Sequence, residues 1–151
     1  MIKVEPGIIG QEFPLGEFLV TADDIRAFAK AIGDHNPLYL DAAAARATGY
    51  PDIIAPPTFC MQIRGGRLLP EVPVDPGYTT LHAGQEFEFY DEMCAGQRYT
   101  AVGKLVEVYE KTGRSGPLGV IVREMIIRDL MGKTITVLRE RQMVRSPEKK
   151  I

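Results

Sequence analysis

Long apolar runs and an excess of charge of one sign are both lacking from this sequence. No stretch is long and apolar enough to span a bilayer, so no membrane-spanning helix is expected. The N-terminal stretch carries Glu5 and Glu12 and lacks the apolar region of a signal peptide. The formal charge of −2 gives no electrostatic reason to expect nucleic acid or an anionic membrane as a partner.

Cysteine and histidine are scarce. Cys60 and Cys94 are far apart and form no C-x-x-C pair, so we expect no disulfide framework and a reducing, cytoplasmic location. His35 and His82 are the only two histidines, and so few soft ligands predict no zinc site. The glycine-rich signatures of nucleotide binding are also missing. The sequence therefore predicts neither a metal nor a cofactor.

The sequence is of a size and composition typical of one globular unit. Its 151 residues fit a single domain over 1–151 with its own core. Hydrophobic residues make up 45% and charged residues 25%, both ordinary values for a globular protein. No internal repeat or linker divides the chain.

The first half has the pattern of short helices. Thr21 is a predicted N-cap with Asp24 three residues on, and Gly33 suits a left-handed helix end. Between them, one helical face is predicted to be buried. The face consists of Ile25, Phe28, Ala29 and Ile32.

Turn chemistry predicts a loop over 34–37, followed by a short helix over 42–47. A second helix is predicted to begin at Pro56-Pro57. It carries Phe59, Met61 and Ile63 and ends at Gly65-Gly66, before a proline-rich loop.

Alternating patterns predict strands in most of the second half. Phe87 and Phe89 alternate with glutamates, as in a half-buried strand. The apolar run 118–128 predicts a central strand; the other strands are expected over 15–20, 99–109 and 134–144, with a turn over 111–116. We therefore expect an α+β fold, a helix lying on an antiparallel sheet. Edge-to-edge pairing with another copy or a related subunit would cover an exposed edge strand.

One segment carries a recognisable motif. Gly33, Asp34, Asn36, Pro37 and Tyr39 follow the pattern G-D-x-N-P-x-H, except for the last position, and the run D-x-x-x-A-x-x-x-G follows. This segment resembles the MaoC-like (R)-specific enoyl-CoA hydratase and 3-hydroxyacyl dehydratase family. The resemblance implies a hot-dog fold, an antiparallel sheet wrapped around a central helix and paired into a double hot dog. It also implies an acyl-CoA or acyl-carrier-protein thioester as ligand.

The family's acid/base pair is an Asp and a His five positions on, which correspond to Asp34 and Tyr39. A tyrosine near its reference pKa of about 10 is a poor base at neutral pH compared with a histidine near about 6.5. His35 is adjacent to Asp34 and is therefore expected to project in another direction. The second departure is Pro56, which has no N–H where the family polarises the thioester carbonyl.

The string A-P-x-T-F at 55–59 is similar to the FAS1-like dehydratase branch, in which a degenerate hot dog supplies the acyl-binding half beside a catalytic one. The resemblance thus implies a degenerate, acyl-binding subunit of a hydratase or dehydratase in a homo- or heterodimer. Asp34 and Tyr39 occupy the two positions of the family's catalytic acid/base pair. The implied substrate-binding residues are Asn36, Ala55 and Phe59.

Three other functions stay open. One is a self-sufficient homodimeric hydratase that uses Asp34 with His35 or Tyr39. Another is a hot-dog thioesterase in which a carboxylate activates water, and the third is an acyl-thioester-binding scaffold without turnover. Turn chemistry alone also explains Asp34 and Asn36. Arginines that could meet CoA phosphates are Arg64, Arg67 and Arg114.

Overall fold

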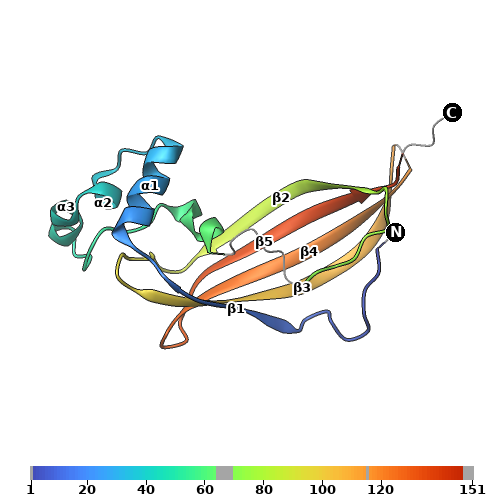
Figure 1. The fold of residues 1–151 in the computed structure, drawn as a ribbon, viewed down its shortest axis with the longest axis horizontal. Helices are drawn as coiled ribbons and strands as arrows, with labels where there is room; N and C mark the ends of the chain where they lie inside the picture. Colours follow the sequence, from blue (N-terminus) through green and yellow to red (C-terminus); the bar gives the residue numbers. More distant parts are fainter. Residues whose placement is uncertain (1, 64–69, 115, 148–151) are drawn as a thin grey trace.

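The structure is a computed structural model that describes residues 2–63, 70–114 and 116–147. Within those ranges the chain forms a five-stranded antiparallel sheet of order β1-β3-β4-β5-β2, with short helices gathered at one end (Figure 1). The predicted helix end at Gly65-Gly66, and Arg64 and Arg67, lie outside the described residues. The elements are β1 (Glu12–Leu19), α1 (Ala22–Ile32), α2 (Pro37–Leu40), α3 (Ala42–Ala47), the 3₁₀ helix η1 (Pro57–Gln62), β2 (Thr79–Phe89), β3 (Arg98–Gly113), β4 (Gly116–Asp129) and β5 (Thr134–Arg145).

The apolar run of the second half forms the middle of the sheet. β4 lies between β3 and β5, and its residues 119–127 are all buried, as the prediction of a central strand requires. The predicted turn over 111–116 is shorter than expected, because Lys111 and Thr112 still pair with Leu118 and Pro117. The positive φ of Gly116, +108°, suits the tight reversal at this point.

Local signals define both ends of α1. The Thr21 Oγ1 accepts the Asp24 N–H at 3.1 Å, and Gly33 adopts the left-handed conformation. Ile25 and Ala29 are buried as predicted, but the prediction for Ile32 is wrong, since this side chain is 50% exposed. Its position explains the difference: α1 lies beyond the end of the sheet instead of along its face (Figure 1), so its last turn has no strand beneath it.

Two further helical segments differ from the prediction. The chain turns into α2 at Pro37, within the expected loop, because the Asn36 side chain caps the new helix by accepting the Leu38 N–H. η1 is a 3₁₀ helix where an ordinary helix was expected. Its Phe59 N–H bonds to the Pro56 carbonyl at 2.9 Å, three residues back, and the two prolines ahead of it provide no N–H.

The core has two parts. Its larger part joins the helices to one end of the sheet through residues such as Ile25, Phe59 and Ile127. A smaller apolar cluster lies under the N-terminal segment and the proline-rich loop. The buried Arg123 ties that loop to the sheet by donating to the Pro70 carbonyl at 3.1 Å. No helix of the described ranges is long and apolar enough to cross a membrane.

Candidate functional site

The motif residues form one compact turn between α1 and α2. The Asp34 Oδ1 accepts the Asn36 N–H at 3.0 Å, and the Asn36 Oδ1 accepts the Leu38 N–H at 3.0 Å. Both side chains are thus engaged with backbone, as turn chemistry requires. One helical turn later, Tyr39 lies close enough to Asp34 and Asn36 to interact with both side chains. Asp34, Asn36 and Tyr39 therefore come together, whereas His35 is exposed.

Tyr39 lines a cavity of about 300 Å³, called here the Tyr39 cavity. Burial raises the pKa of the Tyr39 hydroxyl above its ordinary value, and the negative charges of Asp34 and Glu92 raise it further. At neutral pH the group is therefore a protonated phenol, which can form hydrogen bonds but does not act as a base that takes up a proton. The other lining residues are Ile54, Ala55, Pro56, Pro57, Phe89, Tyr90, Asp91, Glu92, Met93 and Thr136.

The segment where the family polarises the thioester carbonyl has no free donor over 55–57. The Ala55 N–H is already donated to the Met93 carbonyl at 2.7 Å. Pro56 and Pro57 have no N–H at all. An oxyanion formed in the Tyr39 cavity would thus find no backbone donor from these three positions.

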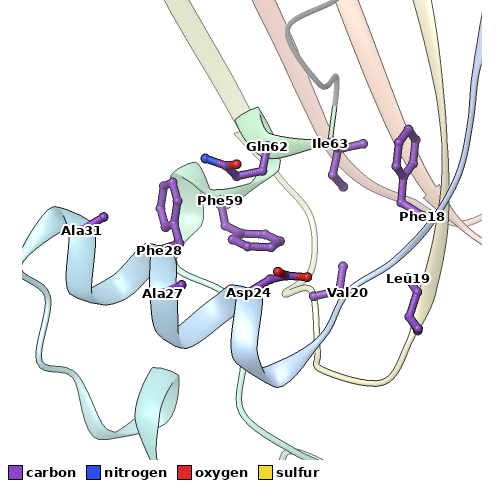
Figure 2. A pocket seen from close by; sticks show the side chains of 10 residues that line it. All are labelled: Phe18, Leu19, Val20, Asp24, Ala27, Phe28, Ala31, Phe59, Gln62 and Ile63. Atoms are coloured by element: carbon purple, nitrogen blue, oxygen red, sulfur yellow. The ribbon is translucent and has the colours of Figure 1, made fainter.

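A second, larger pocket of about 470 Å³ opens between α1, η1 and the end of β1 (Figure 2). Phe59 is only 5% exposed, and its ring meets that of Phe28 edge to face, with centroids 5.5 Å apart. Figure 2 shows the Phe59 ring projecting between α1 and the residues that follow β1. Because most of its lining is apolar, this pocket, called here the Phe59 pocket, suits a hydrocarbon chain. The lining residues are Phe18, Leu19, Val20, Asp24, Ala27, Phe28, Ala31, Phe59, Gln62 and Ile63.

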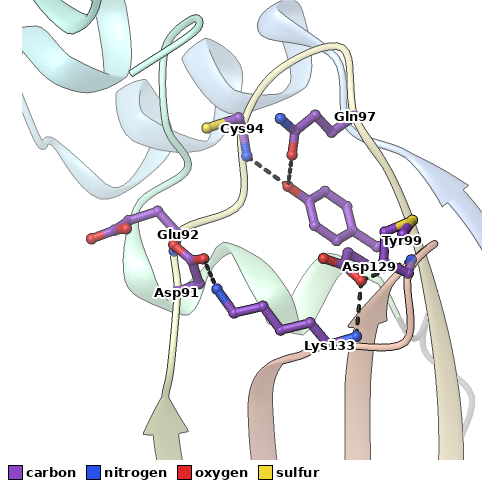
Figure 3. A network of polar contacts seen from close by, with 8 residues as sticks. Asp91, Glu92, Cys94, Gln97, Tyr99, Asp129 and Lys133 are labelled. Carbon is purple, nitrogen blue, oxygen red and sulfur yellow. Dashed lines mark hydrogen bonds and ion pairs between the residues drawn. The ribbon is translucent and has the colours of Figure 1, made fainter. Parts of the chain in front are cut away.

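A polar network fixes the loop between β2 and β3, which forms one wall of the Tyr39 cavity (Figure 3). The buried Tyr99 hydroxyl accepts the Cys94 N–H and donates to Gln97 Oε1, both at 2.9 Å, and burial raises the pKa of Tyr99 to about 12. Asp91 forms an ion pair with Lys133, which lies in the β4–β5 turn directly before β5. Tyr99 and Lys133 thus both fix the position of the β2–β3 loop.

The structure separates the residues that the sequence predicts for substrate binding. Ala55 and Tyr39 line the same cavity, Phe59 lines the other pocket, and Asn36 lies beside Tyr39 without lining the cavity. His82 is elsewhere, on β2, with Nδ1 3.7 Å from the carboxylate of Glu140.

Sequence reasoning missed two parts of the site. It did not identify the cavity wall formed by residues 89–93, or the contribution of Phe18 and Phe28 to the Phe59 pocket. No motif marks these residues, and their neighbours in space are distant in the sequence.

The fold is that of the hot-dog hydratases and dehydratases. The chain superposes on a crystal structure of the C-terminally truncated HadBC (3R-hydroxyacyl-ACP dehydratase) complex from Mycobacterium tuberculosis with a TM-score of 0.74. The identity is 23%, over 93% of this chain and 99% of that one. The (R)-hydratase from A. caviae involved in PHA biosynthesis gives a TM-score of 0.69 at 21% identity, over 95% and 100%. The expected α+β hot-dog fold is therefore confirmed.

The sequence comparisons identify the family within that fold. Residues 7–137 match the family described as FAS1-like, dehydratase domain region. The chain is 33% identical over 117 residues to a UPF0336 protein of Streptomyces coelicolor, covering 74% of this chain and 78% of that protein. It is 36% identical over 118 residues to one of Streptomyces griseus, with 74% and 78% covered. The chain belongs to this FAS1-like dehydratase family, as its A-P-x-T-F string predicts.

Proposed function

We propose that the chain is the acyl-binding subunit of an (R)-specific enoyl-thioester hydratase or 3-hydroxyacyl dehydratase, and that a second hot-dog subunit supplies the catalytic Asp and His. The observation that carries this proposal is Tyr39 at the position of the family's histidine. Its pKa is raised above the ordinary value, so it does not remove a proton from water at neutral pH. The blocked or missing N–H groups over 55–57 support the same reading of the site.

The acyl chain would lie in the Phe59 pocket, whose size and apolar lining suit it. Asn36 and Ala55 stay predicted contacts near the thioester end. Two of the similar structures are named as complexes of two subunits, HadBC and ChsH1-ChsH2 of Mycobacterium tuberculosis. These names support a division of labour between two hot-dog chains.

The two edges of the sheet differ in a way that favours β2 as the pairing edge. β1 is 8 residues long and contains Pro14, which has no N–H to donate. Each edge strand has one register shift, at 14–16 in β1 and at 82–84 in β2, so the proline and the shorter length are what distinguish β1. β2 pairs with β5 alone within the described residues, and most of its eleven residues are exposed. We therefore place the partner subunit along β2.

The test is hydration of trans-2-enoyl-CoA by the purified chain, alone and then with a hot-dog subunit that carries the Asp/His pair. We expect no turnover by the chain alone and turnover by the pair, with Asp34→Asn in this chain changing the rate less than about twofold. Turnover by the chain alone that Asp34→Asn abolishes would instead make it a self-sufficient hydratase. Release of free thiol without hydration would indicate a thioesterase.

A second arm tests where the acyl chain lies. Phe59→Leu removes the ring that meets Phe28 and enlarges the Phe59 pocket. We expect the variant, assembled with the catalytic subunit, to have a higher kcat/KM for longer enoyl chains relative to shorter ones than the wild type has, although the catalytic residues are on the other subunit. Tyr109→Leu, at a partly exposed aromatic residue of β3, is the matched control. A chain-length preference that Phe59→Leu leaves unchanged would place the acyl chain elsewhere.

A further inference from the structure

Two large aromatic side chains are exposed where β2 ends at the Tyr39 cavity. Phe89 is 50% exposed and Tyr90 is 58% exposed, and both line the cavity. Rings of this size gain free energy when another surface covers them, and aromatic residues are enriched in protein interfaces. Glu88, Asp91 and Glu92 beside them are exposed as well, and the exposed residues 88–92 are called here the aromatic end of β2.

The charge of this surface is negative. Glu88 accepts a hydrogen bond from the Tyr90 hydroxyl at 2.6 Å, while Asp91 and Glu92 line the cavity itself. Among the described residues, the ion pair recorded for these three carboxylates is that of Asp91 with Lys133. The charge of Glu92 acts on Tyr39 and is the first cause of the raised pKa of Tyr50. The negative potential thus extends into the cavity.

Such a surface repels the phosphates of CoA or of a phosphopantetheine arm and attracts cations. Aromatic faces add to the attraction for lysine and arginine side chains. The occupant that fits is therefore a basic protein surface, since two exposed rings and two carboxylates lie next to one another at a cavity of about 300 Å³.

The position of the aromatic end of β2 indicates which protein carries this basic surface. The aromatic end follows directly from β2, the edge along which the partner subunit is placed above, so a strand paired with β2 brings its neighbouring loop onto Phe89 and Tyr90. We propose that the aromatic end of β2 docks a lysine- or arginine-bearing surface of the catalytic partner subunit, and that the anionic carrier enters from the partner's side. This inference rests on the proposed function.

The experiment measures the affinity between this chain and the catalytic hot-dog subunit at low and high sodium chloride. The variant is the double substitution Glu88→Gln and Glu92→Gln, which removes two charges without changing side-chain size. The matched control is Glu107→Gln with Glu110→Gln, two exposed glutamates of β3. We expect the first variant to bind about tenfold or more weakly at low salt and to lose most of its salt dependence, as expected when contacts between charges are removed. The control should bind like the wild type.

Equal affinity and equal salt dependence of the two double variants would overturn the inference, while turnover by the assembled pair would leave the proposed function standing. Tighter binding of CoA to the wild-type chain than to the Glu88→Gln, Glu92→Gln variant would overturn it as well, because the glutamates would then favour the carrier instead of repelling it. Assembly of this chain only with itself, or with no hot-dog subunit, would overturn both the inference and the proposed function. Far-UV circular dichroism confirms that the variants are folded, and these surface substitutions leave the core intact.

Discussion

Tyr39 shows how one residue changes what the site can do. A histidine at this position has a reference pKa near about 6.5 and exchanges protons at neutral pH. The tyrosine starts near 10.0, and burial, Asp34 and Glu92 all raise the pKa further. The Asp34 carboxylate beside it bonds to the Asn36 N–H, so a turn is maintained where the family has a catalytic dyad.

We predict that Tyr39→His does not restore hydratase activity to the isolated chain. The new imidazole would supply a base, but the Ala55 N–H would stay bonded to the Met93 carbonyl, and Pro56 and Pro57 would still offer no donor to the thioester. Loss of one such donor costs about a hundredfold or more in rate. The decay of enoyl absorbance measures the reaction, with Tyr109→His as the control. Clear hydration by Tyr39→His would contradict the account of the missing donors.

At the scale of elements, β4 is mostly apolar but carries two adjacent buried charges, Arg123 and Glu124, near its centre. Glu124 is only 8% exposed and bonds to Lys104 of β3 at 2.9 Å and to Arg139 of β5 at 2.7 Å. Burial alone would raise the pKa of Glu124, but the hydrogen bonds and charges of the two cations outweigh it and hold the pKa below its ordinary value. The ion-paired carboxylate therefore ties three strands together.

We predict that Glu124→Gln lowers the free energy of unfolding by about 2 kcal/mol near pH 7, since hydrogen bonds to charged groups contribute roughly that much. A carboxyl whose folded pKa is lowered stabilises the fold above its unfolded pKa of about 4.3 and ceases to do so as the pH falls through the folded pKa. The difference between variant and wild type should therefore shrink in more acidic buffer. Urea unfolding near pH 7 and in the more acidic buffer measures this difference in the free energy of unfolding, with the exposed Glu110→Gln as control. A difference that does not change with pH would contradict the prediction.

The helices also show which structural features a local sequence pattern is sufficient to predict. The cap at Thr21 and the left-handed Gly33 define α1 within a residue or two, because cap geometry depends on neighbours in sequence. The same patterns could not give the position of α1 relative to the sheet. The spacing therefore predicts burial of Ile32, whereas α1 lies beyond the end of the sheet and Ile32 is exposed.

At the scale of the whole molecule, the sheet has one protected and one open edge. Pro14 removes one backbone donor from β1, which is 8 residues long, whereas β2 is 11 residues long, contains no proline and carries the exposed Leu81 and Phe89. An open edge of this length is a template for a further strand. This asymmetry is the reason for placing the partner along β2.

We predict that Leu81→Lys weakens association with the partner subunit by about tenfold or more, because a charged side chain on an edge strand opposes strand pairing. The free energy of unfolding should change by less than about 0.5 kcal/mol, since Leu81 is 47% exposed. Sedimentation velocity measures the assembly. Leu130→Lys, at a similarly exposed leucine in the β4–β5 turn, is the control. Association that survives Leu81→Lys would exclude β2 as the pairing edge.

The sequence by itself determined what depends on neighbours along the chain. The helix caps, the apolar central strand and the motif from Gly33 to Tyr39 are encoded by spacings of a few residues, and the motif with A-P-x-T-F was enough for the family. Only the tertiary structure decided that residues 89–93 close the Tyr39 cavity, that Phe28 meets Phe59, and that Lys104 and Arg139 meet at Glu124. These contacts join segments that are far apart in sequence. Sheet order, strand register and the packing of helices bring those segments together, and no local pattern specifies any of the three.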